Sequence, residues 1–233
     1  MFSILVLGFL IGIRHAFEPD HVAAVASLAT RTTSFRQAAR QGAAWGLGHT
    51  LTLFIVCTVV LLLDAQLSEQ LAGYLEAAVG AMLMLLGTDV IRRLVRDRIH
   101  FHAHRHADGV THFHAHSHAG EAPKVHDSRH HQHEHRAGYP YRALCVGLMH
   151  GMAGSAALIV LAAQAAQSIW LGLAYVALFG VGSIVGMAVF SAIISLPLKS
   201  AQTLTWVNNS LHAAVGIGTV ALGATTLYQH LVA

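Results

Sequence analysis

Histidine and carboxylate side chains are concentrated in one short segment near the N-terminus. His15, Asp20 and His21 follow a long apolar run, with Arg14 directly before them and Glu18 between them. Imidazole nitrogens and a carboxylate oxygen form a ligand set that suits Ni2+, Co2+, Zn2+ and Cu2+, and the absence of thiolates argues against Cu+. The segment therefore predicts a divalent metal site with His15, Asp20 and His21 as ligands. The alternative is that these groups only pair with one another to hold helices together.

The spacing of these residues is incompatible with a straight helix. At 100° per residue, His15 lies about 140° from Asp20 and about 120° from His21 around the helix axis. Pro19 has no N–H to bond the carbonyl of His15, and its ring crowds that turn. We therefore predict that the helix kinks or unwinds at Pro19, which would free the His15 carbonyl as a further oxygen ligand.

Other polar residues lie in the apolar segments that follow. His49 comes after Gly46 and Gly48, small residues that let helices approach closely, so it is either a further ligand or a packing histidine. Ionisable groups are costly inside a membrane and are candidates for function by default. Groups that could support the ligands or gate the path, or serve structure alone, are Arg14, Glu18, Glu76, His150, Ser155 and His212.

The elements that must position these residues are membrane helices. The 233-residue chain is 55% hydrophobic and only 11% charged, which is membrane rather than soluble composition. A bilayer core takes roughly 20 helical residues. Six segments are long enough: 2–29, 41–63, 70–92, 140–165, 169–196 and 203–229.

Basic residues predict the orientation of these spans. Arg31, Arg36 and Arg40 follow the first span, further arginines follow the third, and Lys199 follows the fifth. The alternate loops carry acidic residues or no charge. By the positive-inside rule the basic loops are cytoplasmic, so both termini face outward. Because the basic residues flank apolar segments, the net charge of +3 indicates topology and predicts no nucleic-acid partner.

The two halves of the chain resemble each other. Spans one and four share an apolar-Gly-apolar-x-His pattern, spans two and five share aromatic-Gly-apolar-Gly-polar, and spans three and six share Leu-x-Ala-Ala-Val-Gly, at offsets of 135, 134 and 136 residues. Because each unit has three spans, an odd number, the second copy lies in the membrane upside down relative to the first. The sequence thus predicts an all-α membrane protein with an inverted 3+3 repeat, residues 1–98 and 139–233, as in many secondary transporters.

Residues 99–138, between the halves, form a histidine-rich loop. We expect this cytoplasmic loop to be disordered, because its apolar content is too low for a core. It would buffer, sense or deliver metal through neutral imidazoles, unless it is a tolerated low-complexity insertion. Thirteen of the 19 histidines lie there: His100, His102, His104, His106, His112, His114, His116, His118, His126, His130, His131, His133 and His135.

The residues above resemble the nickel/cobalt transporter family. That family is marked by His-x4-Asp-His in a membrane helix, here His15 to His21, followed by a Gly-His motif, here Gly48-His49. The likeness is strongest to its compact six-helix, UreH-like branch of urease accessory proteins. The resemblance implies that His15, Asp20, His21 and His49 bind or select the metal. Pro19 departs from the small residue usual before the Asp-His pair.

These features predict a secondary transporter in the cell inner membrane that moves Ni2+ or Co2+ as substrate. Uptake for a metalloenzyme such as urease or hydrogenase is the main hypothesis. Efflux and non-transporting metal storage or delivery are the alternatives. No Gly-x4-Gly-Lys-Ser/Thr loop is present for ATP hydrolysis by that route. We expect no enzymatic activity and no organic cofactor. The expected partners are lipid, the metal ion and cytosolic nickel chaperones.

Overall fold

The computed structural model describes residues 2–32, 34–63, 68–96, 99–105, 111–117, 140–152, 168–200 and 205–231. Several predicted positions lie outside the described residues. They are Ser155, the second half of the predicted fourth span, and the loop histidines His106, His118, His126, His130, His131, His133 and His135.

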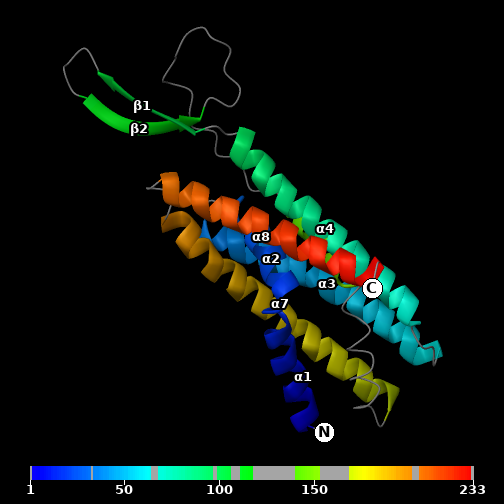
Figure 1. Cartoon of the computed structure of the whole chain (residues 1–233). Helices are drawn as coiled ribbons and strands as arrows, with labels where there is room; N and C mark the ends of the chain where they lie inside the picture. Colours follow the sequence, from blue (N-terminus) through cyan, green and yellow to red (C-terminus); the bar gives the residue numbers. More distant parts are fainter. Residues whose placement is uncertain are drawn as a thin grey trace.

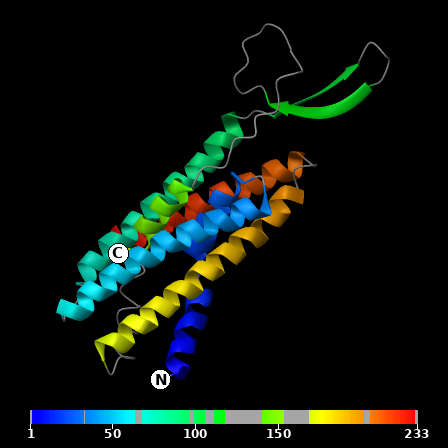
Figure 2. The same cartoon turned by 180° about the vertical axis from the view of Figure 1, so that it is seen from behind.

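The described chain is mainly helical (Figures 1 and 2). Its helices are α1 (Phe2–His15), α2 (Pro19–Ala29), α3 (Phe35–Leu63), α4 (Glu69–Arg96), α5 (Tyr141–His150), α7 (Ile169–Ser200) and α8 (Thr205–Leu231). A two-stranded sheet consists of β1 (Ile99–Arg105) and β2 (Thr111–Ser117).

Four of the described helices are long and apolar enough to cross a membrane by length and composition. They are Phe35–Leu63, Gln70–Arg96, Ile169–Ser200 and Trp206–Leu231. Large apolar side chains such as Leu63, Leu85 and Ile217 point outward on them, which suits lipid rather than water. The molecule is a helical membrane protein. The first predicted span is divided between α1 and α2, and α5 covers only the start of the fourth.

The break in the first span lies where Pro19 predicts it. α1 ends at His15, Glu18 is extended with φ −64° and ψ 146°, and Pro19 opens α2. A proline costs least at a helix start, where its missing N–H would have no partner anyway. The predicted break is therefore confirmed. The His15 carbonyl is not free, however, because it accepts a hydrogen bond from the Glu18 N–H at 3.0 Å.

Helices from the two halves of the chain pack on each other. α1 packs on α7, α5 packs on α3, and α4 packs along α8, whereas α2 lies against α7, α8 and α4. Figure 1 shows α1 crossing α7 and the α4–α8 pair on another side of the bundle. The helices that carry the predicted metal ligands are thus held mainly by the opposite half.

Glycines make these helix crossings close, and they do so in matched pairs. A Cβ added at Gly12 of α1 would lie under 3.0 Å from the Phe179 carbonyl of α7. A Cβ added at Gly147 of α5 would meet the Trp45 carbonyl of α3 in the same way. Gly147 follows Gly12 by 135 positions, and Phe179 follows Trp45 by 134. The two crossings therefore use residues that correspond in the sequence repeat.

The contact between α4 and α8 shows the same correspondence. Gly80 lies against the carbonyl of Gly223, and Gly87 lies against the carbonyl of Gly216. Each glycine of α8 stands 136 positions after one of α4. Small residues of this kind let membrane helices approach until their backbones touch.

An ion-pair network joins the end of α2, α4 and the start of α5. The Oδ2 atom of Asp89 lies 2.5 Å from Arg31 Nη2, 3.2 Å from Arg142 Nη2 and 3.4 Å from Arg93 Nε. Arg93 also donates a hydrogen bond to Thr30 at 3.0 Å. Because one carboxylate serves three guanidinium groups, this network ties segments from both halves at one end of the bundle.

The expectation of disorder throughout the histidine-rich loop is wrong for β1 and β2. These strands pair antiparallel, with Cα partners His100 and His116, His102 and His114, and His104 and His112. Strict alternation of histidine with other residues has the two-residue period of a strand, and Phe101 and Phe113 favour it. Both views show the hairpin beyond the C-terminal end of α4, away from the helices (Figures 1 and 2).

Candidate metal centre

Three of the predicted ligands meet at the break between α1 and α2. His15 ends α1, His21 lies in the first turn of α2, and His49 comes from α3. One ligand atom from each lies within 4.8 Å of the other two. The His15 and His49 Nε2 atoms are 3.2 Å apart. We call this set the trihistidine group.

Burial makes the trihistidine group unusual. His15 is 7% exposed, His21 1% and His49 fully buried. The Nε2 of His21 and the Nδ1 of His49 have no hydrogen-bond partner among the described residues. Leaving a buried polar atom unpaired costs about 1–3 kcal/mol. A bound cation would give these imidazole nitrogens a partner, because neutral imidazole binds a metal ion through its nitrogen lone pair.

Asp20 lies at the centre of a second set, the Asp20 group, with His21 and His150. Its Oδ1 lies 2.8 Å from His21 Nδ1 and its Oδ2 lies 2.8 Å from His150 Nε2. The Oδ1 atom also accepts the backbone N–H of His21. The first and second halves of the chain are thus joined directly at the site.

Two roles for Asp20 follow from these contacts. A carboxylate bonded to the second nitrogen of a ligand histidine fixes the ring and strengthens it as a donor. In that arrangement His15, His21 and His49 hold the ion, while Asp20 orients His21. Alternatively, Asp20, His21 and His150 hold it themselves. His21 belongs to both sets, so it takes part in either arrangement.

Two aromatic rings lie beside the histidines. The Phe179 ring lies 5.2 Å from the His15 ring, and the Trp45 ring lies 5.4 Å from the His150 ring, centroid to centroid. Both aromatic residues are fully buried. Apolar walls exclude water and strengthen electrostatic interactions inside the site. Because Phe179 and Trp45 correspond in the repeat, as do His15 and His150, each half supplies the wall for the other's histidine.

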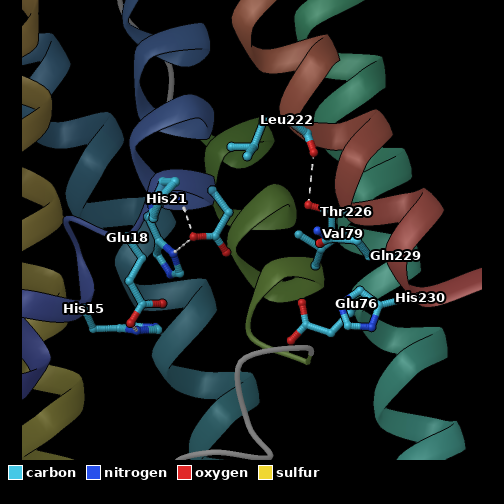
Figure 3. A pocket seen from close by; sticks show the side chains of 11 residues that line it. His15, Glu18, His21, Glu76, Val79, Leu222, Thr226, Gln229 and His230 are labelled. Carbon is cyan, nitrogen blue, oxygen red and sulfur yellow. Dashed lines mark hydrogen bonds and ion pairs between the residues drawn. The ribbon is translucent and has the colours of Figure 1, made fainter. Parts of the chain in front are cut away.

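A cavity of about 340 Å³ adjoins this cluster (Figure 3). We call it the Glu76 cavity. Figure 3 shows His15, Glu18 and His21 on one side of it and Glu76 with His230 on the other. Its lining residues are His15, Glu18, Pro19, Asp20, His21, Glu76, Val79, Leu222, Thr226, Gln229 and His230.

The other predicted residues are distributed unevenly around the site. Glu18 contacts His15, with 2.9 Å between Oε1 and Nδ1, and Glu76 lines the cavity. Arg14 is exposed. His212 bonds to the carbonyl of Asn208 in its own helix at 2.8 Å and is not among the described residues that line the cavity.

Sequence reasoning underrated or missed four residues. His150 was expected only to support or gate the site, yet it contacts Asp20 directly. Its correspondence to His15 in the repeat was the available signal. The sequence marks Trp45 and Phe179 only through the repeat pattern, and His230 lies in a helical turn with no motif around it.

The break at Pro19 gives a prediction that separates geometry from chemistry. Replacing Pro19→Ala restores an N–H at residue 19 and allows α1 and α2 to join. His15 and His21 would then turn apart, so we expect Ni2+ affinity at the membrane site to fall by about tenfold or more. Metal titration of purified protein lacking residues 99–136 measures this. Unchanged affinity would mean that the ligand geometry does not depend on proline.

Long apolar helices around a buried, mostly imidazole-lined centre define the class of the protein as a metal-binding membrane protein. Residues 1–229 match the NicO family, described as high-affinity nickel-transport protein, and the chain belongs to that family. The resemblance read from the sequence is therefore confirmed.

Two curated proteins are similar to the chain. Urease accessory protein UreH of Bacillus sp. (strain TB-90) is 31% identical over 232 residues, covering 98% of this chain and 92% of that protein. Chloroplast protein FOR GROWTH AND FERTILITY 1 of Arabidopsis thaliana is 29% identical over 223 residues, covering 91% of this chain and 57% of that protein. No solved structure matches the chain.

Proposed function

We propose that the protein is a secondary transporter that takes up Ni2+ or Co2+ across the cytoplasmic membrane. The buried trihistidine group, formed where a membrane helix is broken, is the observation that carries this proposal. Broken helices near the membrane midplane are typical substrate sites of secondary transporters. Family membership supports nickel as the substrate, and the ligand chemistry suits cobalt equally.

We further propose that residues 1–98 and 139–233 form an inverted repeat of six membrane segments, with both termini outside. The paired glycine contacts of Gly12 with Phe179 and Gly147 with Trp45 support a two-fold relation between the halves. The basic residues after α2 and at the end of α7 support a cytoplasmic position for those ends. An ion held between two such halves can be exposed to either side by a small relative movement of the halves.

The membrane potential is sufficient to drive uptake. An inside-negative potential contributes about 2.3 kcal/mol per charge per 100 mV, hence about 4.6 kcal/mol for a divalent ion. That free energy corresponds to roughly 2,000-fold accumulation. Uptake therefore needs no ATP, whereas efflux against this potential would need a coupling ion.

Metal transport by the full chain in proteoliposomes tests the proposal. We expect Ni2+ or Co2+ uptake that accelerates when the interior is made negative with a potassium diffusion potential. Release driven by a proton gradient would indicate efflux instead. Binding without flux under either condition would indicate a storage or delivery protein.

We propose that the histidine-rich loop buffers metal on the cytoplasmic side and passes it to nickel chaperones for an enzyme such as urease or hydrogenase. The similarity to a urease accessory protein supports a urease client. The described part of the loop, β1 and β2, lies beyond the C-terminal end of α4 and away from the helices in Figure 1. We therefore expect deletion of residues 99–136 to lower the total amount of bound Ni2+. The initial rate of uptake should change by less than about threefold, because distant sites usually contribute independently. Loss of all uptake would place the loop in the conduction path.

A further inference from the structure

The Glu76 cavity contains potential metal ligands beyond the histidine cluster. We propose that Glu76 and His230 form a second, outer binding position for a divalent cation, from which the ion passes to the trihistidine group. This inference rests on the proposed transport function and adds a site to it.

The far wall of the cavity carries oxygen and nitrogen donors. Glu76 of α4 and His230 of α8 face the cavity opposite His15, Glu18 and His21 (Figure 3). Gln229 adds an amide. Carboxylate and imidazole together suit the same borderline divalent ions as the inner site. His21 also lines this cavity. It is 1% exposed and its Nε2 has no partner among the described residues, so it offers a nitrogen that an ion could bind.

The size of the cavity fits an ion that still carries water. At about 30 Å³ per water molecule, 340 Å³ holds roughly ten waters. A cation could therefore bind Glu76 and His230 while keeping part of its hydration shell. It would lose the remaining water only on reaching the buried imidazoles.

Glu18 connects the two positions. Its carboxylate contacts His15 at 2.9 Å, yet its side chain is 54% exposed and lines the cavity. A carboxylate that reaches both the cavity and an inner ligand can hold the ion while its water is exchanged for imidazole.

The position of the cavity suits recruitment from one side only. Glu76 lies near the start of α4, and His230 lies in the last turn of α8, where the negative end of the helix dipole favours a cation. The residue that corresponds to Gln229 in the first half, 136 positions earlier, is Arg93. Arg93 pairs with Asp89 in the network that also includes Arg31 and Arg142. One end of the bundle thus offers cation ligands, and the other carries guanidinium groups that repel a cation.

Uptake kinetics of the full chain in proteoliposomes test the outer position. A cleft that is lined by charge of the opposite sign raises the local concentration of a charged substrate by about tenfold or more. We expect Glu76→Gln and His230→Gln each to raise the KM for Ni2+ about tenfold and to leave the maximal rate within about twofold of the wild type. Glu76→Asp should restore most of the affinity. The matched control is Tyr228→Phe, which lies on the same exposed end of α8 but does not line the cavity.

The outcomes separate this inference from the transport proposal. No Ni2+ flux by the wild type would overturn the proposed function itself. Flux by the wild type with unchanged KM in both variants, or a fall in maximal rate without a change in KM, would overturn the outer position.

A labelling measurement covers variants that fail to fold. The two cysteines of the chain are first removed by Cys57→Ala and Cys145→Ala, so that Gln229→Cys carries the only thiol. This thiol should react with a membrane-impermeant reagent added outside. Micromolar Ni2+ should slow that reaction at least about fivefold, whereas Mg2+, which retains its water and prefers oxygen ligands, should not. Absence of protection by Ni2+ would count against the outer position.

Discussion

Replacing His21→Ala is expected to abolish both Ni2+ binding at the membrane site and Ni2+ uptake. His21 belongs to the trihistidine group and to the Asp20 group, so no arrangement of the site survives its loss. Even a residue that only supports a metal ligand is worth about 10–100-fold in affinity, so the loss should exceed about 100-fold. Titration of protein lacking residues 99–136 measures binding, and proteoliposome uptake measures transport.

Companion variants decide which side chains hold the ion. If the trihistidine group binds it, His15→Ala and His49→Ala should match His21→Ala, whereas His150→Ala should cost only about tenfold. If the Asp20 group binds it, His150→Ala should be the severe variant. Met149→Leu, an exposed neighbour of His150, is the matched control. Normal uptake by both His15→Ala and His21→Ala would disprove the site assignment.

Replacing the glycines where α1 crosses α7 and α5 crosses α3 is the second change with a large expected effect. This effect concerns folding rather than metal binding. In Gly12→Ala the new methyl group would lie under 3.0 Å from the Phe179 carbonyl, and in Gly147→Ala it would meet the Trp45 carbonyl. The contacted atoms are backbone, so relief requires the helices to separate. Overpacking of this kind costs typically 1–3 kcal/mol and occasionally more. We expect each variant to lower the thermal unfolding temperature in detergent by several degrees and to reduce uptake.

Gly218 of α8 provides the matched control. Nothing lies within 4 Å of a Cβ placed there. Alanine is favoured over glycine inside a helix by about 1 kcal/mol, so Gly218→Ala should keep or raise the unfolding temperature. Equal destabilisation by all three substitutions would show that loss of glycine as such, rather than the helix crossing, is responsible.

The helical elements could be predicted from the sequence because lipid imposes a simple rule on them. A segment of sufficient length and apolarity must be helical, so α3, α4, α7 and α8 agree with predicted spans within a few residues at most ends. The break at Pro19 followed from the missing N–H. The hairpin of β1 and β2 does not follow from the low apolar content of this segment, and its signal in the sequence is the alternation of histidine along each strand.

The site was predictable only where its residues are neighbours in sequence. His15, Asp20 and His21 share one segment, and His49 followed from a short motif. The contact of His150 with Asp20 joins residues 130 positions apart, so it depends on how α5 and α2 are placed by packing. Likewise, His230 reaches the cavity only because the end of α8 lies beside the start of α4. The inverted repeat and the orientation in the membrane stay predictions.

The packing of α1 on α7 and of α3 on α5 has a consequence for biosynthesis. His15, His21 and His49 are all present once the first three helices have been made, but the partners that hold α1 and α3 in place are translated later. A half-finished chain thus carries the candidate ligands without Phe179 and the other residues of the second half that pack on them. We therefore expect ion binding at this site only after α7 and α8, which pack on α1, α2 and α3, have been made.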